Sequence, residues 1–261
     1  MELQTITVQR EAHLATVTLN RPDVRNAFNE TTISEITQVF RELDHDAAIR
    51  VVVLAANGPA FCAGADLNWM KKMADYTYEE NIADAGQLAA MLGAIYRCSK
   101  PVIARVQGDC YAGGMGLVAA CDITVAVDSA NFCLSEVRLG LIPATISPYV
   151  IKAMGENAAR RYFLTAERFS AAEAKACGFV HEVVSAGALD DRVAELVKAI
   201  SGNSPNAVRQ AKQLVEDVAG QEIDEHLVAS TVRGIAEIRA SEEGREGVRS
   251  FLEKRKPFWL S

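Results

Sequence analysis

The stretch "DCYAGGMGLVAACD", residues 109–122, is the part of the sequence that says most about the fold. It is an apolar run with the pattern of a buried helix, yet it contains Gly113, Gly114 and Gly116. Glycine inside a helix is less favourable than alanine by roughly 1 kcal/mol. The three glycines therefore need a reason, which is either close packing or the approach of another group to this backbone.

A buried strand precedes this stretch, and the same succession occurs once earlier in the chain. The runs "IRVVVLAA" (49–56) and "PVIARVQG" (101–108) are apolar and rich in β-branched residues, which predicts strands buried on both faces. A loop of small residues follows each of them: 57–66 is rich in turn residues, and the second loop leads into the glycine stretch.

Ligands of α/β sheets bind at the carboxyl ends of strands, where helix N-termini present unpaired N–H groups. Two such groups directed at one oxygen would stabilise an oxyanion. The alternative is a pair of tight turns in which glycine serves packing alone.

The other segments divide the chain into two parts. Periodicity predicts two strands over 5–20, an amphipathic helix over 29–46, helices over 67–74 and 80–98, two short strands over 123–134 and a strand over 179–184. Three amphipathic helices then follow, with caps at Ser204, Asp224 and Ser241. We therefore predict an α/β core over 1–195 and a helical region over 196–261 that completes its burial against another subunit.

Bulk composition restricts the function classes. The chain has 261 residues, of which 49% are hydrophobic and 23% charged, as in an ordinary globular domain. The net charge of −7 argues against nucleic acid as the main partner. No secretory signal or membrane span is evident, the six cysteines form no CxxC pair and the four histidines have no metal-ligand spacing. We expect a cytoplasmic protein with reduced thiols, no metal site and no membrane contact.

Glu136 is the best candidate for proton transfer. It lies in "FCLSEVRLGLIP" between apolar residues, and no lysine is within four positions. Such surroundings favour a raised carboxyl pKa, which suits a general acid or base. The alternative is a structural role in which Glu136 pairs with Arg138 or caps a helix.

Four motifs in this order, "NRPDVRNAF", "FCAGADL", "YAGGMGLVAACD" and "SEVRLGLIP", resemble the enoyl-CoA hydratase/isomerase family, also called the crotonase family. The resemblance extends over nearly the whole chain. It implies a crotonase-like spiral of repeated ββα units with C-terminal helices that assemble trimers, often paired into hexamers. It also implies a coenzyme A thioester as substrate, without a prosthetic group.

The same resemblance assigns roles to particular residues. The thioester oxygen would meet the backbone N–H groups of Ala65 and Gly113, and Glu136 would handle protons. Coenzyme A would be bound by the loop and by nearby basic residues, namely Ala63, Asp66, Leu67, Arg25 and Lys254, the last from a neighbouring subunit. Arg25 and Lys254 have the alternative of being solvated surface charges.

The sequence departs from the family pattern at one position. Many hydratases of the family have a second glutamate just after the glycines, where this chain has Gly116. Three hypotheses follow: a hydratase that uses Glu136 alone, an isomerase in which Glu136 moves a proton between C2 and C4, or a site with room for a bulkier or branched acyl group. A non-catalytic protein that binds coenzyme A or RNA is the alternative of another class.

A finer resemblance concerns "GADLNWMKKMA" together with "LSEVRLGLIPATISPYV". These segments are similar to the branch that hydrates methylglutaconyl-CoA or isohexenylglutaconyl-CoA. Such substrates are branched and carry a second carboxylate, which needs a polar partner. The candidates are Asn68, Lys71, Lys72, Tyr111 and the backbone of 145–147.

Overall fold

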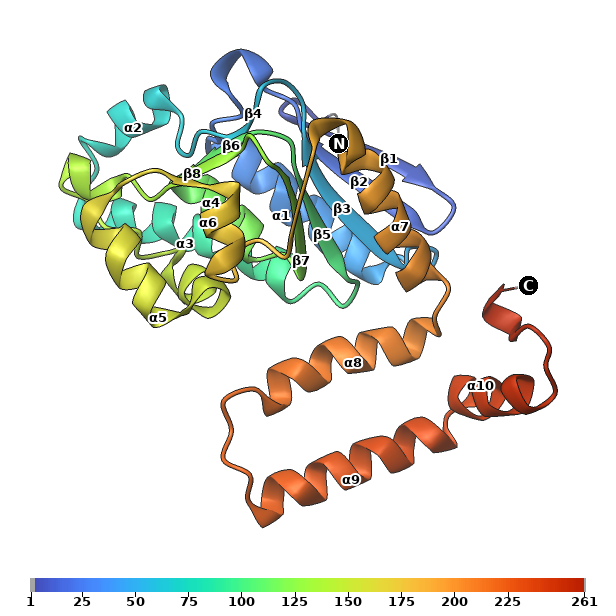
Figure 1. Ribbon diagram of the computed structural model, residues 1–261. Helices are drawn as coiled ribbons and strands as arrows, with labels where there is room; N and C mark the ends of the chain where they lie inside the picture. The colour runs from blue at the N-terminus through green and yellow to red at the C-terminus, as the bar shows by residue number, and fades with distance from the viewer. Residues whose placement is uncertain (1–2, 261) are drawn as a thin grey trace.

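The computed structural model describes residues 3–260, and its centre is a six-stranded sheet (Figure 1). The strand order is β1-β2-β3-β5-β7-β10, in which β1 is antiparallel to β2 and the remaining pairs are parallel. The strands are β1 (Ile6–Glu11), β2 (Leu14–Leu19), β3 (Val51–Ala56), β5 (Val102–Val106), β7 (Ile123–Val127) and β10 (Glu182–Val184). All six residues of β3 are buried, which confirms the prediction of a central strand.

A second, smaller sheet lies beside the first, in the order β4-β6-β8-β9. Its strands are β4 (Ala60–Cys62), β6 (Asp109–Tyr111), β8 (Asn131–Cys133) and β9 (Phe169–Ser170). β4, β6 and β8 are parallel, and β9 runs antiparallel to β8. The loop predicted over 57–66 contains β4, and the small-residue loop predicted after 101–108 contains β6. Both strands were missed, because strands of three residues are too short to show alternation.

Helices complete a unit that repeats along the chain. A strand of the large sheet is followed by a strand of the small sheet and then by helix, as in β3-β4-α2, β5-β6-α4 and β7-β8-α5. This repetition agrees with the spiral of ββα units that the resemblance implies. The helices are α1 (Glu30–His45), α2 (Leu67–Met73), α3 (Tyr78–Tyr96), α4 (Gly113–Ala119), α5 (Ser147–Thr165), α6 (Ala171–Ala176) and α7 (Leu189–Ser201).

The last three helices extend away from the core (Figure 1). They are α8 (Pro205–Val218), α9 (Glu225–Ala240) and α10 (Glu242–Leu252), and their N-caps are Ser204, Asp224 and Ser241, as predicted. Neither α8 nor α9 contains a buried residue. Lys212 on α8 reaches the core, where its Nζ lies 2.7 Å from Oδ2 of Asp122.

Candidate active site

Three strand ends of the small sheet converge on the residues that the sequence singled out. β4, β6 and β8 are neighbouring parallel strands, so their carboxyl ends lie at the same edge. Ala65 follows β4, Gly113 follows β6, and Glu136 follows β8. The predicted loops thus meet at the small sheet, which the sequence analysis had not separated from the large one.

The backbone around Ala65 is held by Phe28. The N–H of Phe28 donates to the carbonyl of Gly64 at 2.9 Å, and the N–H of Asp66 donates to the carbonyl of Phe28 at 3.0 Å. In this parallel bridge the N–H of Ala65 itself points away from Phe28. Within residues 3–260 it has no hydrogen-bond acceptor, so it can donate to a ligand.

Gly113 begins α4, so its N–H is one of the helix-terminal donors that lack an acceptor inside the helix. The residue before it, Ala112, has φ 48° and ψ −125°, outside the regions that L-residues prefer. A Cβ placed on Gly64 would lie 3.6 Å from the nitrogen of Gly113 and 3.0 Å from the Cβ of Ala112. The two loops are therefore in direct contact.

Close packing explains the three glycines of the opening stretch. A Cβ on Gly113 would lie 2.5 Å from Cζ of Phe28, and one on Gly114 would lie 2.8 Å from the carbonyl oxygen of Cys62. A Cβ on Gly116 would lie 2.3 Å from Cγ2 of Ile146. Gly113 thus both packs closely against Phe28 and presents an unpaired N–H group.

The contacts of Gly116 bear on the missing second glutamate. Side chains of Ile146 and Leu92 occupy the space beside its Cα, and both are buried. The hypothesis that the absent carboxylate leaves room for a bulkier acyl group was wrong at this position, because the protein itself fills the space.

Glu136 is the first residue of a 3₁₀ turn, η2 (Glu136–Leu139). Burial raises the pKa of its carboxyl above the ordinary value of 4.5, and a hydrogen bond from the backbone only partly offsets this. Its Oε2 is buried and has no hydrogen-bond partner within the described chain. Arg138 instead donates to the carbonyl of Ala166 at 2.5 Å, so the alternative Glu136–Arg138 pair is not formed.

Asp66 is a buried acid that organises the loop next to Ala65. Burial alone would raise its pKa, but the guanidinium of Arg21 at 2.8 Å and the N–H groups of Asn68 and Trp69 hold the pKa below its usual range. Its side chain also caps α2. The Asp66 carboxylate is therefore engaged inside the protein, and the Arg21 partner was not foreseen from the sequence.

The structure brings together some of the predicted coenzyme A residues and not others. The N–H of Ala63 donates to the carbonyl of Arg25 at 2.9 Å, so these two residues are neighbours. Leu67 is 74% exposed at the start of α2. Lys254 follows α10, which lies at the other end of the molecule from α2 (Figure 1).

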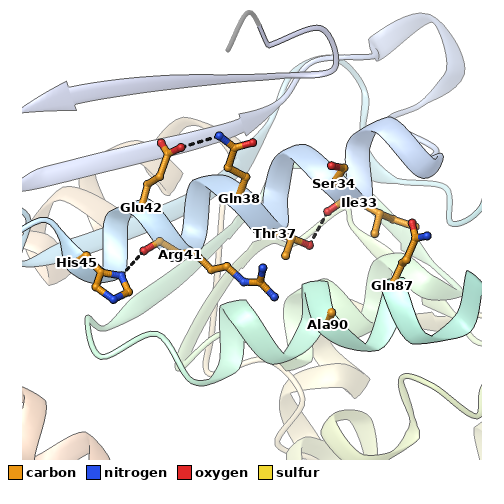
Figure 2. Close-up of a pocket in the computed structure, with 9 residues that line it drawn as sticks. All are labelled: Ile33, Ser34, Thr37, Gln38, Arg41, Glu42, His45, Gln87 and Ala90. Atoms are coloured by element: carbon orange, nitrogen blue, oxygen red, sulfur yellow. Dashed lines mark hydrogen bonds between the residues drawn. The ribbon is translucent and has the colours of Figure 1, made fainter. Parts of the chain in front are cut away.

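A separate cavity of about 730 Å³ lies between α1 and α3 (Figure 2). Its polar side chains bond mainly along α1: the hydroxyl of Thr37 donates to the carbonyl of Ile33, and Gln38 donates to Glu42. The guanidinium of Arg41 points into the space between the two helices. None of the residues at the three strand ends lines this cavity.

Other features concern metals, thiols and membranes. No group of three or more His, Cys, Asp or Glu side chains within residues 3–260 is arranged to hold a metal ion. All six cysteines are free thiols. In the same part of the chain, no helix combines the length and apolarity that crossing a membrane requires.

Comparison with known proteins identifies the family. The family model described as "Enoyl-CoA hydratase/isomerase" matches residues 9–261. This chain belongs to the enoyl-CoA hydratase/isomerase family. Members of the family act on coenzyme A thioesters and carry no prosthetic group.

Solved structures of other proteins agree closely with this fold. An enoyl-CoA hydratase from Shewanella pealeana is 43% identical, with a TM-score of 0.96 over 99% of this chain and 97% of that one. AtuE of Pseudomonas aeruginosa is 32% identical, with a TM-score of 0.94 over 99% and 100%.

A curated relative is also similar over almost its full length. The mevalonyl-coenzyme A hydratase sidH of Aspergillus fumigatus is 36% identical over 95% of this chain and 91% of the relative.

Proposed function

We propose that this protein is an enoyl-CoA hydratase, a hydro-lyase that adds water across the C2–C3 double bond of an acyl-CoA thioester. The observation that carries the proposal is the buried, unpartnered Oε2 of Glu136 at the same sheet edge as the unpaired N–H groups of Ala65 and Gly113. An acid at the same sheet edge as two unpaired donors suits a reaction in which a proton moves while an oxyanion forms.

In this mechanism the thioester oxygen accepts hydrogen bonds from Ala65 and Gly113. Electron density moves from the C2–C3 double bond toward that oxygen, so C3 becomes electrophilic. The carboxylate of Glu136 takes a proton from water as the hydroxide adds to C3. The protonated Glu136 then returns its proton to C2 of the enolate, which completes the addition of one water.

One carboxyl group serves both steps in this scheme. Packing against Ile146 at Gly116 makes a second carboxylate there incompatible with the present backbone. The raised pKa of Glu136 suits both roles, because its protonated form lies closer in free energy to its ionised form at neutral pH.

For the acyl group, we infer a branched glutaconyl type such as 3-methylglutaconyl-CoA, on the segments around Asn68 and Glu136 that resemble that branch. The second carboxylate of this substrate needs a cationic partner. Lys72 is paired with Glu30 at 2.9 Å, and the hydroxyl of Tyr111 donates to Asp109. Lys71 forms no ion pair within the described chain, which favours it among the candidates.

Coenzyme A binding extends the same proposal. The neighbouring segments of Arg25 and Ala63, with Leu67 exposed beyond them, would hold the nucleotide end. The side chain of Asp66 would act indirectly, by fixing this loop. Lys254 would reach the phosphates only from another subunit of the trimer or hexamer that residues 196–261 assemble.

Mass spectrometry of the products tests the reaction. The pure protein is given a 2-enoyl-CoA, a 3-enoyl-CoA and 3-methylglutaconyl-CoA in separate reactions. We expect a gain of one water on the conjugated substrates, fastest with 3-methylglutaconyl-CoA. A double-bond shift in the 3-enoyl compound, followed by the ultraviolet absorbance of the conjugated thioester and without a mass gain, would establish the isomerase alternative. No change with any substrate, together with RNA retention on a filter at physiological salt, would favour a binding protein.

A Glu136→Gln variant tests the role of the carboxyl. We expect turnover to fall by about 10²–10⁴-fold, because the variant cannot transfer the proton. Glu156→Gln, the same change at an exposed glutamate on α5, is the control and should retain the wild-type rate. Near-normal activity of folded Glu136→Gln would contradict the assignment.

A further inference from the structure

Phe28 contacts both loops that carry the unpaired N–H groups. Its backbone N–H and C=O bond to Gly64 and Asp66, on either side of Ala65. Its ring lies against Gly113, where Cζ occupies the place of a side chain at that position. The backbone of Phe28 is thus bonded on either side of Ala65, and its ring packs against Gly113.

The ring of Phe28 is itself held in place. Phe28 is 1% exposed, and its ring centroid lies 5.8 Å from that of Trp69, with the planes tilted by 53°. Trp69 is 3% exposed, and its Nε1 donates to Oδ1 of Asp84 on α3 at 3.0 Å. A continuous set of contacts therefore runs from Asp84 through Trp69 and Phe28 to Gly113.

We propose that Phe28 is a positioning residue that sets the placement of the Ala65 and Gly113 N–H groups relative to each other. The inference rests on the proposed function in that the thioester oxygen meets these two donors. An oxyanion site depends on donors fixed before the reaction, and an error of about 1 Å in such a site costs on the order of 10²-fold in rate. Gly113 has no side chain to anchor it, so the ring of Phe28 supplies that contact.

The test compares three variants of the full-length protein. Phe28→Leu removes the ring contact with Gly113 and keeps an apolar side chain of moderate size. Phe40→Leu is the matched control, since Phe40 is a fully buried phenylalanine on α1. Trp69→Phe keeps a ring beside Phe28 but lacks the Nε1 donor to Asp84, and it serves if Phe28→Leu fails to fold.

Two measurements separate positioning from loss of stability. The first is kcat and KM with the best enoyl-CoA, at a temperature where circular dichroism shows each variant folded. The second is the infrared carbonyl band of bound butanoyl-CoA labelled with ¹³C at the thioester carbon. Butanoyl-CoA is saturated and is not hydrated, so its band reports donor placement whatever reaction the enzyme catalyses.

For Phe28→Leu we expect kcat to fall by about 10–100-fold with KM little changed, and the carbonyl band of the bound thioester to shift less than in the wild type. Trp69→Phe should show a smaller change in the same direction, and Phe40→Leu should match the wild type in both measurements. If folded Phe28→Leu and Phe40→Leu give the same kcat and the same band, the inference is wrong.

Failure of the proposed function looks different. If the wild-type protein shifts the carbonyl band but adds no water, the proposed hydratase activity is wrong. The positioning role of Phe28 is then tested by the carbonyl band alone. A wild-type protein that leaves the band of the bound thioester unshifted overturns both.

Discussion

Glu136 lies in surroundings that disfavour an ionised carboxyl. Its carboxyl is largely buried, one oxygen has no partner among residues 3–260, and Arg138 bonds elsewhere. Such an arrangement is unfavourable for a structural ion pair and suitable for a proton carrier. The apolar neighbours in the sequence were sufficient to predict the raised pKa of Glu136, because burial is its main cause.

The raised pKa of Glu136 predicts a pH-dependent effect on stability. The folded-state pKa exceeds the unfolded value of 4.5, so protonation favours the folded state. The stabilisation is present below the unfolded pKa and is lost as pH rises through the folded pKa. Glu136→Gln should therefore melt at a higher temperature than the wild type at pH 7, and the difference should shrink below about pH 4.5. Thermal melts across this range measure it, and a pH-independent difference would contradict the prediction.

Ala112 carries backbone strain immediately before Gly113. Its φ of 48° and ψ of −125° suit glycine, and a disfavoured conformation of this kind costs about 1–3 kcal/mol. Ala112→Gly should therefore raise the free energy of unfolding by about 1 kcal/mol, after loss of the methyl contact with Gly64.

Chemical denaturation of Ala112→Gly measures this gain, and Ala166→Gly provides the comparison. Ala166 has φ 50° and ψ 23°, inside the left-handed region, and its methyl is fully buried. Relief of the left-handed conformation at Ala166 is offset by loss of the packing of its buried methyl, so Ala166→Gly should yield a smaller gain. If Ala112→Gly is no more stable than the wild type, the strain at position 112 is unimportant.

At the scale of elements, the sequence predicted most of the long structures and missed the shortest strands, but it also missed two long helices, α5 and α7. The helix at 29–46 and the strand at 49–56 have enough residues for their periodicity to be read. β4 and β6 have three residues each, and their pairing depends on partners far away in the sequence. The contact of Phe28 with Gly113 is invisible in the pattern for the same reason.

An ion pair of Lys212 joins α8 to the core, and the same lysine also donates to the carbonyl of Lys100. Lys212 lies 2.7 Å from Asp122, its side chain is 13% exposed, and Asp122 also accepts from the N–H of Val102. Lys212→Met should lower the free energy of unfolding by about 1–3 kcal/mol, because it leaves a half-buried carboxylate without its cation.

Urea unfolding of Lys212→Met measures this loss. Arg160→Met is the control, since it breaks the largely exposed pair with Glu156 and should change stability by less than about 1 kcal/mol. Equal effects of the two substitutions would show that the Lys212–Asp122 pair does not anchor α8.

At the scale of the whole molecule, the C-terminal helices leave large apolar side chains exposed in the single chain. Val228, Val232 and Ile235 share one face of α9 and are 49%, 60% and 48% exposed. The sequence predicted that this region finishes its burial in an oligomer, and the family resemblance implied a trimer or hexamer. The oligomeric state in solution stays a prediction.

Sedimentation equilibrium tests the assembly. The wild type should have three or six times the mass of the chain, and Val232→Glu should reduce that mass by placing a charge on the apolar face of α9. Ser230→Glu puts the same charge about 160° around the helix and should leave the assembly intact. A Val232→Glu protein with the wild-type mass would contradict a role for this face.

The return of the chain end to the core has a consequence for cleavage of the polypeptide. After α8, α9 and α10, the carbonyl of Trp259 accepts a hydrogen bond from Arg50, and Glu243 on α10 accepts from the hydroxyl of Ser204 and the N–H of Asn206. The turn between α8 and α9 is exposed, with Ile223 86% accessible. A protease that cuts this turn separates the chain into two fragments. The hydrogen bonds to Trp259 and Glu243 still hold the C-terminal fragment to the N-terminal one. The nicked protein should therefore migrate as two fragments in denaturing gels and as one particle in native ones.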